Sequence, residues 1–411
     1  MLGSKEKVLN YNPDSKKIIS LFMSVQFLGF FFFNGFRVIF PLILEKMGYT
    51  ELEVYANWAI IFGFGLFISS LTRYPLGIIA DKLSRKITLT LSVFFVGISI
   101  IIIGLSDNIF ILAFFFGVMR TGTHLPPIIT RGFINETEKS KQGTINGYGS
   151  FVSNIGGMIG PILFEYFLHL SLATLVILSN VILFAFYIFY MLKLPAKKTR
   201  NAIPINVFIK TSFVELMKFK RVIVLYIILG TINGIINYLQ FPYAYYILNL
   251  SGSYSSFLIG IITLFSTLFI LYAGKLTDQI GVQNTIYLGL VVIILGSIVQ
   301  ILDQSSVLDY FICQLLINGG LLLGQNALVT HITLYSKNST TSSIFGGTTS
   351  FYFFGSSLLP LVNVFIPGSS NLLYSQDPLL PFFLIIFISG IIFPIAFIVG
   401  RKKQSPKIAF V

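Results

Sequence analysis

The chain alternates long apolar runs with short polar segments. Twelve of the runs are long enough to cross a bilayer, which needs about 20 mostly apolar residues per helix. They cover residues 18–44, 55–80, 87–105, 109–133, 144–168, 172–192, 221–248, 254–275, 283–302, 308–334, 343–366 and 380–400. The pattern predicts an all-α membrane protein with about twelve transmembrane helices. The first residues are polar and no small-residue cleavage site follows the first run, which indicates a retained helix rather than a signal peptide.

The longest polar segment separates six apolar runs from six. It predicts an N-terminal six-helix bundle over 1–192, a cytoplasmic linker over 193–220 and a C-terminal six-helix bundle over 221–411, arranged as pseudo-repeats around a central cavity. With both termini in the cytoplasm, nearly all of the 28 Lys and Arg residues fall in cytoplasmic segments, as the positive-inside rule requires. We therefore expect a multi-pass protein of the cell membrane with both termini cytoplasmic.

The composition agrees with this class of protein. Hydrophobic residues make up 55% of the chain and charged residues 10%, whereas a soluble domain carries about a quarter charged residues. The net charge of +13 would suit a nucleic-acid-binding protein, but the basic residues follow the predicted topology, so we expect no nucleic-acid partner. A single cysteine, Cys313, excludes an internal disulfide framework. Phosphate-loop and metal-ligand spacings are missing from the sequence, so we expect no cofactor and no metal.

One short motif occurs in both halves of the chain. The sequence "GIIADKLSRK" starts at Gly77, after the second apolar run, and "GKLTDQIGVQ" starts at Gly274, after the second run of the C-terminal half. In each copy an aspartate follows the glycine four residues later, at Asp81 and Asp278. The matching positions indicate an internal repeat.

This pattern resembles the major facilitator superfamily of twelve-helix secondary transporters, whose loop signature reads roughly G-x-x-x-D-R-x-G-R-K. The residues that match the two family signatures are Gly77, Asp81, Arg85 and Lys86 in the loop, and Gly156, Gly160 and Pro161 in a G-x-x-x-G-P motif of the fifth run. The resemblance implies that these residues, with Gly274 and Asp278, act in gating by alternating access. The fifth-run signature is closest to members that export drugs or metabolites by proton antiport. We expect a monomer.

The charged loop has a physical role in this interpretation. Gly77 has no side chain, so a neighbouring helix can approach closely. Asp81 can accept hydrogen bonds from the N-terminus of a helix in the other half, near Ser342 and Ser343. Arg85 and Lys86 can pair with Glu136 or Glu138 of the next cytoplasmic loop. The alternative is a solvated loop that only obeys the positive-inside rule.

Two arginines lie deep within apolar runs, Arg37 in the outer half of the first and Arg120 near the middle of the fourth. A charge at this depth normally faces the bundle interior or a water-filled cavity. His124 follows Arg120 by one helical turn, and Asn and Gln residues recur at helical spacing in other runs. The resemblance places these positions on the transport path. The predicted substrate-binding residues are Asn34, Arg37, Arg120, His124, Asn154, Asn233, Asn237, Gln240, Gln314, Asn318 and Gln325.

The same polar residues have a purely structural alternative. They could hold helices together by hydrogen bonds, with Arg120 bound to backbone carbonyls and Arg37 reaching the membrane surface. No acid falls near the centre of a run, so His124 and Glu165, at the outer end of the fifth run, are the candidates for proton coupling.

We interpret the chain as a secondary active transporter of a small organic solute, and favour efflux, with an anionic solute suggested by the two arginines. Proton-coupled uptake of a sugar or organic acid is the alternative, because Asn and Gln can bind hydroxyl groups. A lipid-modifying membrane enzyme is the hypothesis from another class. Three scattered histidines, one cysteine and no acid pair within a run argue against it. The expected partners are the substrate, a proton as coupling ion and the lipid bilayer.

Overall fold

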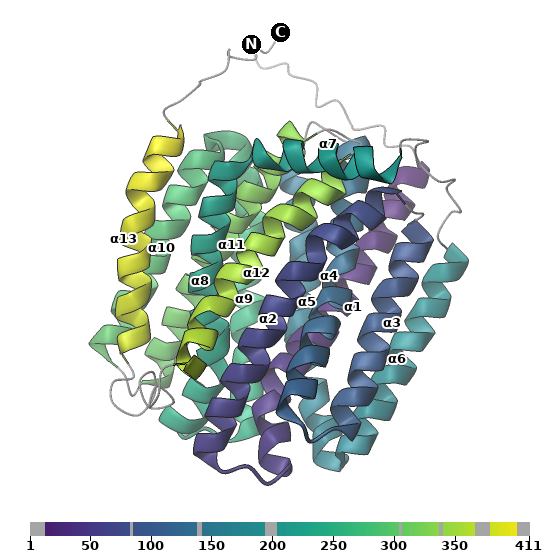
Figure 1. Ribbon diagram of the computed structural model, residues 1–411. Helices are drawn as coiled ribbons and strands as arrows, with labels where there is room; N and C mark the ends of the chain where they lie inside the picture. Colours follow the sequence, from purple (N-terminus) through teal and green to yellow (C-terminus); the bar gives the residue numbers. More distant parts are fainter. Residues whose placement is uncertain are drawn as a thin grey trace.

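The computed structural model describes residues 13–82, 85–137, 142–193, 204–303, 306–336, 340–365 and 379–400. These residues form helices and no strand (Figure 1). The helices are α1 Pro13–Lys46, α2 Glu51–Lys82, α3 Arg85–Leu105, α4 Ile109–Thr137, α5 Gln142–Leu170, α6 Leu172–Lys193, α7 Ile205–Met217, α8 Lys220–Pro242, the π-helical turn η1 Tyr243–Ile247, α9 Gly252–Ile280, α10 Val282–Leu302, α11 Val307–Tyr335, α12 Thr341–Phe365 and α13 Leu380–Gly400. A helix satisfies its backbone hydrogen bonds internally, which a lipid environment demands.

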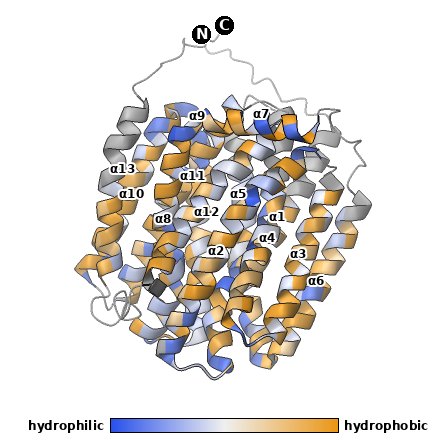
Figure 2. Ribbon diagram, in the orientation of Figure 1, coloured by the Kyte–Doolittle hydropathy of each residue, from blue (hydrophilic) through white to orange (hydrophobic). Residues whose placement is uncertain are grey.

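Each expected apolar run coincides with a helix, and the all-α membrane fold is confirmed. Within the described residues, 10 helices are long and apolar enough to cross a membrane, namely α1 to α6 and α8 to α11. Large apolar side chains such as Phe94, Phe184 and Tyr272 are exposed on the outside of the bundle, and Figure 2 shows apolar residues along the outward faces of the helices. The number of twelve crossings stays a prediction.

Helices from the two halves of the sequence pack against each other along two lines. The helix α2 lies along α12, and α5 lies along α9. Within the first half α1 packs on α5 and α4, and within the second half α10 packs on α11. The pairs α3 with α6 and α10 with α13 lie towards the two sides of the molecule in Figure 1. The division into bundles 1–192 and 221–411 stays a prediction.

The G-x-x-x-G-P motif is where α5 packs most closely on α1. A Cβ atom added at Gly160 would meet the carbonyl of Phe31 and lie 3.1 Å from the backbone nitrogen of Gly35, and one added at Gly156 would meet the carbonyl of Phe27. A larger residue at either position would force the helices apart. The motif therefore fixes the distance between α5 and α1.

The polar segment predicted as a linker contains a helix that the sequence did not reveal. The helix α7 lies across one end of the bundle (Figure 1). Its own residues Phe208 and Leu216 are buried. The Lys82 Nζ atom, at the end of α2, lies 4.9 Å from the centroid of the Phe208 ring. We call this the α7 end, and the other end of the bundle the opposite end; the α7 end is the predicted cytoplasmic side.

The opposite end also joins the first two helices to the second half of the chain. The indole nitrogen of Trp58, in α2, donates a hydrogen bond to the carbonyl of Tyr238, in α8, at 3.3 Å. The Tyr246 hydroxyl, in η1, donates to the Glu45 carboxylate, at the end of α1, at 2.6 Å. These two hydrogen bonds connect the first and second halves of the chain at the opposite end.

Candidate functional site

A central cavity of about 140 Å³ lies between α1, α4, α5, α8, α9, α11 and α12. The predicted substrate-binding residues that line it are Asn34, Arg37, Arg120, His124, Asn154, Asn233, Asn237, Gln240, Asn318 and Gln325. Gln314 does not line it: its side chain is buried one turn away, and its carbonyl accepts a hydrogen bond from the Asn318 amide at 2.8 Å. Helical spacing thus brings together polar residues from helices far apart in the sequence.

The two predicted arginines occupy different parts of this cavity. The Arg37 Nη2 atom donates a hydrogen bond to Gln240 Oε1 at 3.3 Å, and its Nε atom is buried without a partner. The Cζ atom of Arg120 lies 3.2 Å from the centroid of the Phe33 ring and 4.7 Å from that of Phe353, in cation–π contact. The Nε atom of Arg120 is also buried without a partner. Both guanidinium groups therefore retain unused hydrogen-bond donors.

A third buried arginine, Arg73, was missed by the sequence analysis. It lies in α2 and is only 2% exposed, and its Cζ atom lies 3.4 Å from the centroid of the Phe353 ring. Its Nε atom donates to the Ser69 hydroxyl at 3.2 Å, while its Nη2 atom has no partner. Its distance from the end of the helix was the available signal, because nine residues separate it from Lys82, or about 14 Å of helix.

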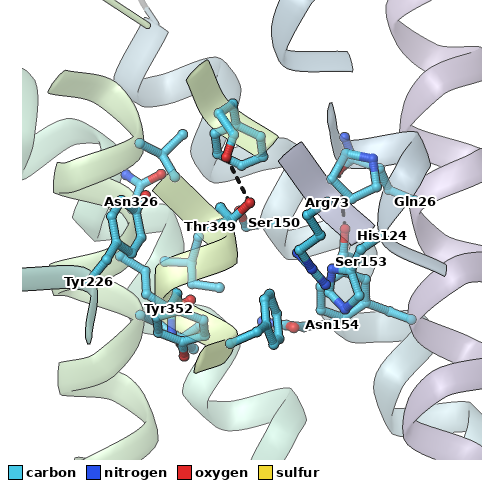
Figure 3. Close-up of a pocket in the computed structure, with 18 residues that line it drawn as sticks. Gln26, Arg73, His124, Ser150, Ser153, Asn154, Tyr226, Asn326, Thr349 and Tyr352 are labelled. Carbon is cyan, nitrogen blue, oxygen red and sulfur yellow. Dashed lines mark hydrogen bonds between the residues drawn. The ribbon is translucent and has the colours of Figure 1, made fainter. Parts of the chain in front are cut away.

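The side chain of Arg73 enters a second cavity, also of about 140 Å³, between the central cavity and the α7 end. We call it the α7-end cavity. Figure 3 shows Arg73 reaching into its middle, with Gln26, Ser153 and His124 to one side and Tyr226 and Asn326 to the other. The two cavities share part of their walls: Phe30, His124, Asn154, Leu322, Gln325, Tyr352 and Phe353 line both.

The described residues that line these two cavities include three arginines and no carboxylate. Arg73 and Arg37 both act on Arg120 as like charges, and no carboxylate in the described part of the chain pairs with any of the three. A buried charge without a counter-ion is costly, by several kcal/mol even after relaxation. An anion that entered the cavities would remove part of this cost.

The amides of α8 are held by hydrogen bonds among themselves. The Asn237 side-chain nitrogen donates to Asn233 Oδ1 at 2.6 Å, and the Asn233 side-chain nitrogen lies 3.5 Å from the Ser356 hydroxyl of α12. Gln325 donates to the Tyr352 hydroxyl. These hydrogen bonds orient the side chains that line the cavity. The same side chains therefore both form hydrogen bonds within the protein and line the cavity.

The loop contact expected for Asp81 is present. Its carboxylate accepts hydrogen bonds from the backbone nitrogens of Ser342 at 3.2 Å and Ser343 at 2.7 Å, and from the Ser343 hydroxyl at 2.5 Å. These nitrogens belong to the first turn of α12, where a helix favours negative charge. A Cβ atom at Gly77 would lie 2.6 Å from the Ser342 carbonyl, so glycine permits the approach. We call this contact the Asp81 latch.

The family model described as Major Facilitator Superfamily matches residues 22–360. The chain belongs to the major facilitator superfamily. As a member of this superfamily it is a secondary transporter rather than an enzyme. A comparison with curated protein sequences finds no significant match.

Solved structures share this superfamily fold at low sequence identity. The human organic anion transporter MFSD10 (TETRAN) has a TM-score of 0.73 at 13% identity, over 94% of this chain and 100% of that chain. A bacterial homologue of the iron transporter ferroportin, in the outward-facing state with soaked iron, has a TM-score of 0.69 at 13% identity, over 94% and 100%. The outward-facing structure of a bacterial ferroportin homologue scores 0.68 at 14% identity, over 92% and 98%. Likeness at this identity shows the fold alone.

The other predicted gating residues of this superfamily member have different surroundings. Asp278, the second-half counterpart of Asp81, is exposed. Gly274 is buried, and its Cα would lie 3.7 Å from a Cβ atom added at Gly147 in α5. The side chains of Arg85, Lys86 and their expected partners Glu136 and Glu138 lie outside the described part of the structure.

The two candidates for proton coupling lie apart. His124 is 8% exposed and lines both cavities, and its ring packs near Phe30, Phe33 and Phe353. Glu165 is 5% exposed near the opposite end, with one carboxylate oxygen 3.4 Å from His169 Nε2. Glu165 and Glu45 line a separate cavity there. His124 is thus the candidate that lies beside the arginines.

Proposed function

We propose that this superfamily member transports a small organic anion by alternating access between the α7 end and the opposite end. The supporting observation is that Arg37, Arg73 and Arg120 are buried and have no paired carboxylate among the described residues. A bound anion would supply the missing counter-charge and accept hydrogen bonds from the unused guanidinium donors. Apolar and aromatic lining residues such as Phe33 and Leu321 suit an organic body on that anion.

We further propose that the direction is export, with a proton as the coupling ion. The support for export is the G-x-x-x-G-P motif at the contact of α5 with α1, and the support for proton coupling is His124 beside the arginines. We assign the Asp81 latch to the gate at the α7 end, and the Glu45 and Trp58 contacts to the gate at the opposite end. The name of the human organic anion transporter agrees with this substrate class, but the proposal rests on the arginines.

The test is uptake by the purified protein in vesicles. We expect saturable uptake of radiolabelled benzoate, with competition by other organic anions but not by glucose or tetraphenylphosphonium. Arg120→Gln and Arg37→Gln should each raise KM for benzoate about 10- to 100-fold, because a hydrogen bond to a charged group contributes about 1.5–3 kcal/mol. The control is Lys210→Gln, which removes an exposed charge on α7.

Folded protein must be quantified separately for each variant. If the arginines only hold helices together, the substitutions lower the amount of folded protein and leave KM unchanged. Unchanged KM in both folded variants, or uptake of glucose in preference to benzoate, overturns the anion proposal.

A further inference from the structure

We infer that Arg73 forms a second anion subsite in the α7-end cavity, distinct from the central cavity that holds Arg37 and Arg120. This inference rests on the proposed transport of an organic anion and adds a second binding site to the transport path. The positions of the two arginines in their helices give the order of the two subsites along the bundle. Arg37 lies nine residues, or about 14 Å, before the end of α1 at the opposite end. Arg73 lies nine residues, or about 14 Å, before the end of α2 at the α7 end.

The α7-end cavity is rich in unused donors. The donors Arg73 Nη2, Gln26 Nε2 and Asn326 Nδ2 are buried without a hydrogen-bond partner, as is His124 Nε2, and all four side chains line this cavity. Asn326 is 4% exposed, and neither of its polar atoms is bonded. Buried polar groups are usually hydrogen-bonded, so a cluster of unpaired donors points to a ligand that accepts from them.

Arg73 is held in position for such a ligand. The hydrogen bond from Nε to the Ser69 hydroxyl and the contact with the Phe353 ring fix the guanidinium plane, and Nη2 remains unbonded. Among the described residues no carboxylate lines the α7-end cavity, and Asp81, the acid at the same end of α2, is engaged with Ser342 and Ser343. A pre-positioned guanidinium with unused donors recognises a carboxylate or sulfonate better than it recognises a neutral group.

Apolar side chains also line the cavity. They are Ile270 of α9, Leu322 and Val329 of α11, and Phe345 of α12. The ligand that fits is therefore a small organic monoanion with an apolar body, whose charged group binds Arg73 and whose body packs on these side chains.

Phe353 links the two subsites. Its ring contacts the guanidinium groups of both Arg73 and Arg120 and lines both cavities. An anion that leaves Arg120 for the α7 end meets Arg73 beyond this shared wall. The path thus offers one cation in each cavity, Arg120 in the central cavity and Arg73 in the α7-end cavity, and both contact Phe353.

The experiment measures KM from each face of the membrane. Purified full-length protein is placed in vesicles, and labelling of a cysteine at Asn249, exposed at the opposite end, with an impermeant biotin reagent captures the vesicles in which that end faces outward, so that the two orientations are assayed separately. Benzoate and 1-naphthalenesulfonate are the probes. We expect Arg73→Gln to raise KM about 10-fold or more when the probe is presented at the α7 end, and to change it less than 3-fold at the opposite end. Arg37→Gln should give the reverse pattern.

Two further variants guard against misfolding of Arg73→Gln. Asn326→Leu breaks no hydrogen bond that the protein makes, so it should fold, and it should raise KM at the α7 end alone. Arg73→Lys keeps the charge but not the planar fork, and should recover part of the affinity. Lys210→Gln is the matched control for loss of a positive charge.

The outcomes separate the two proposals. If Arg37→Gln and Arg120→Gln raise KM while Arg73→Gln and Asn326→Leu leave it unchanged at both faces, the second subsite is wrong and the anion function stands. If the wild-type protein binds neither probe, both proposals are overturned. An equal rise at both faces for Arg73→Gln refutes the subsite and indicates one shared site.

Discussion

The Asp81 latch gives the sharpest prediction about gating, because its strength can be estimated. The carboxylate accepts three hydrogen bonds from the first turn of α12. In Asp81→Asn the side chain keeps one acceptor oxygen and loses the charge and the second acceptor. A hydrogen bond to a charged group contributes about 1.5–3 kcal/mol, and a charge at a helix N-terminus about 0.3–1 kcal/mol. We expect the closed α7 end to lose about 2–4 kcal/mol, which shifts the ratio of closed to open states roughly 30- to 700-fold.

The assay follows the accessibility of the α7-end cavity. A cysteine replaces Val329, which lines that cavity and is 8% exposed, in a chain where the buried Cys313 is changed to serine. Alkylation by a water-soluble maleimide should be at least tenfold faster when Asp81→Asn is added. The matched control is Asp107→Asn, an exposed aspartate between α3 and α4 at the opposite end, which should leave the rate unchanged. Equal rates for Asp81→Asn and its parent, in folded protein, would refute the latch.

Two further predictions concern packing and topology. Gly160→Ala should destabilise the protein by about 1–3 kcal/mol, because the new methyl group meets the α1 backbone, whereas Gly390→Ala enters open space and should be neutral; thermal unfolding measures both. A cysteine at Lys210 should react with an impermeant reagent only after cells are permeabilised, and one at Asn249 without permeabilisation. The reverse pattern would mean that the predicted orientation is wrong.

The helices were predictable from the sequence because a long apolar run has few alternatives to a helix in a bilayer. The residues at which the helices begin and end were less predictable. The seventh run continues past Pro242 into the π-helical turn η1, and hydropathy alone does not distinguish this turn from α-helix. The helix α7 was missed because residues 193–220 are polar on average, although Phe208 and Leu216 form a buried side.

The candidate site was predictable where one helix carried the whole signal. Asn233, Asn237 and Gln240 recur at helical spacing, and all three line the central cavity. Contacts between helices were not predictable: the bond from Arg37 to Gln240 joins residues 203 positions apart. Arg73 falls within the expected run 55–80 but was not chosen as a site residue, because its burial depends on contacts with other helices such as that with Phe353.

The contact between α2 and α8 at the opposite end places a natural fluorescent probe, Trp58, at that end of the protein. Trp58 is the single tryptophan of the chain, so all indole fluorescence comes from one site. Its ring is 1% exposed and its N–H is bonded to the Tyr238 carbonyl across the two halves. In the proposed alternating access, opening of the opposite end separates α2 from α8, breaks this bond and lets water reach the ring, which moves indole emission to longer wavelength. We therefore expect the unlabelled wild-type protein to report the opening of that gate in real time.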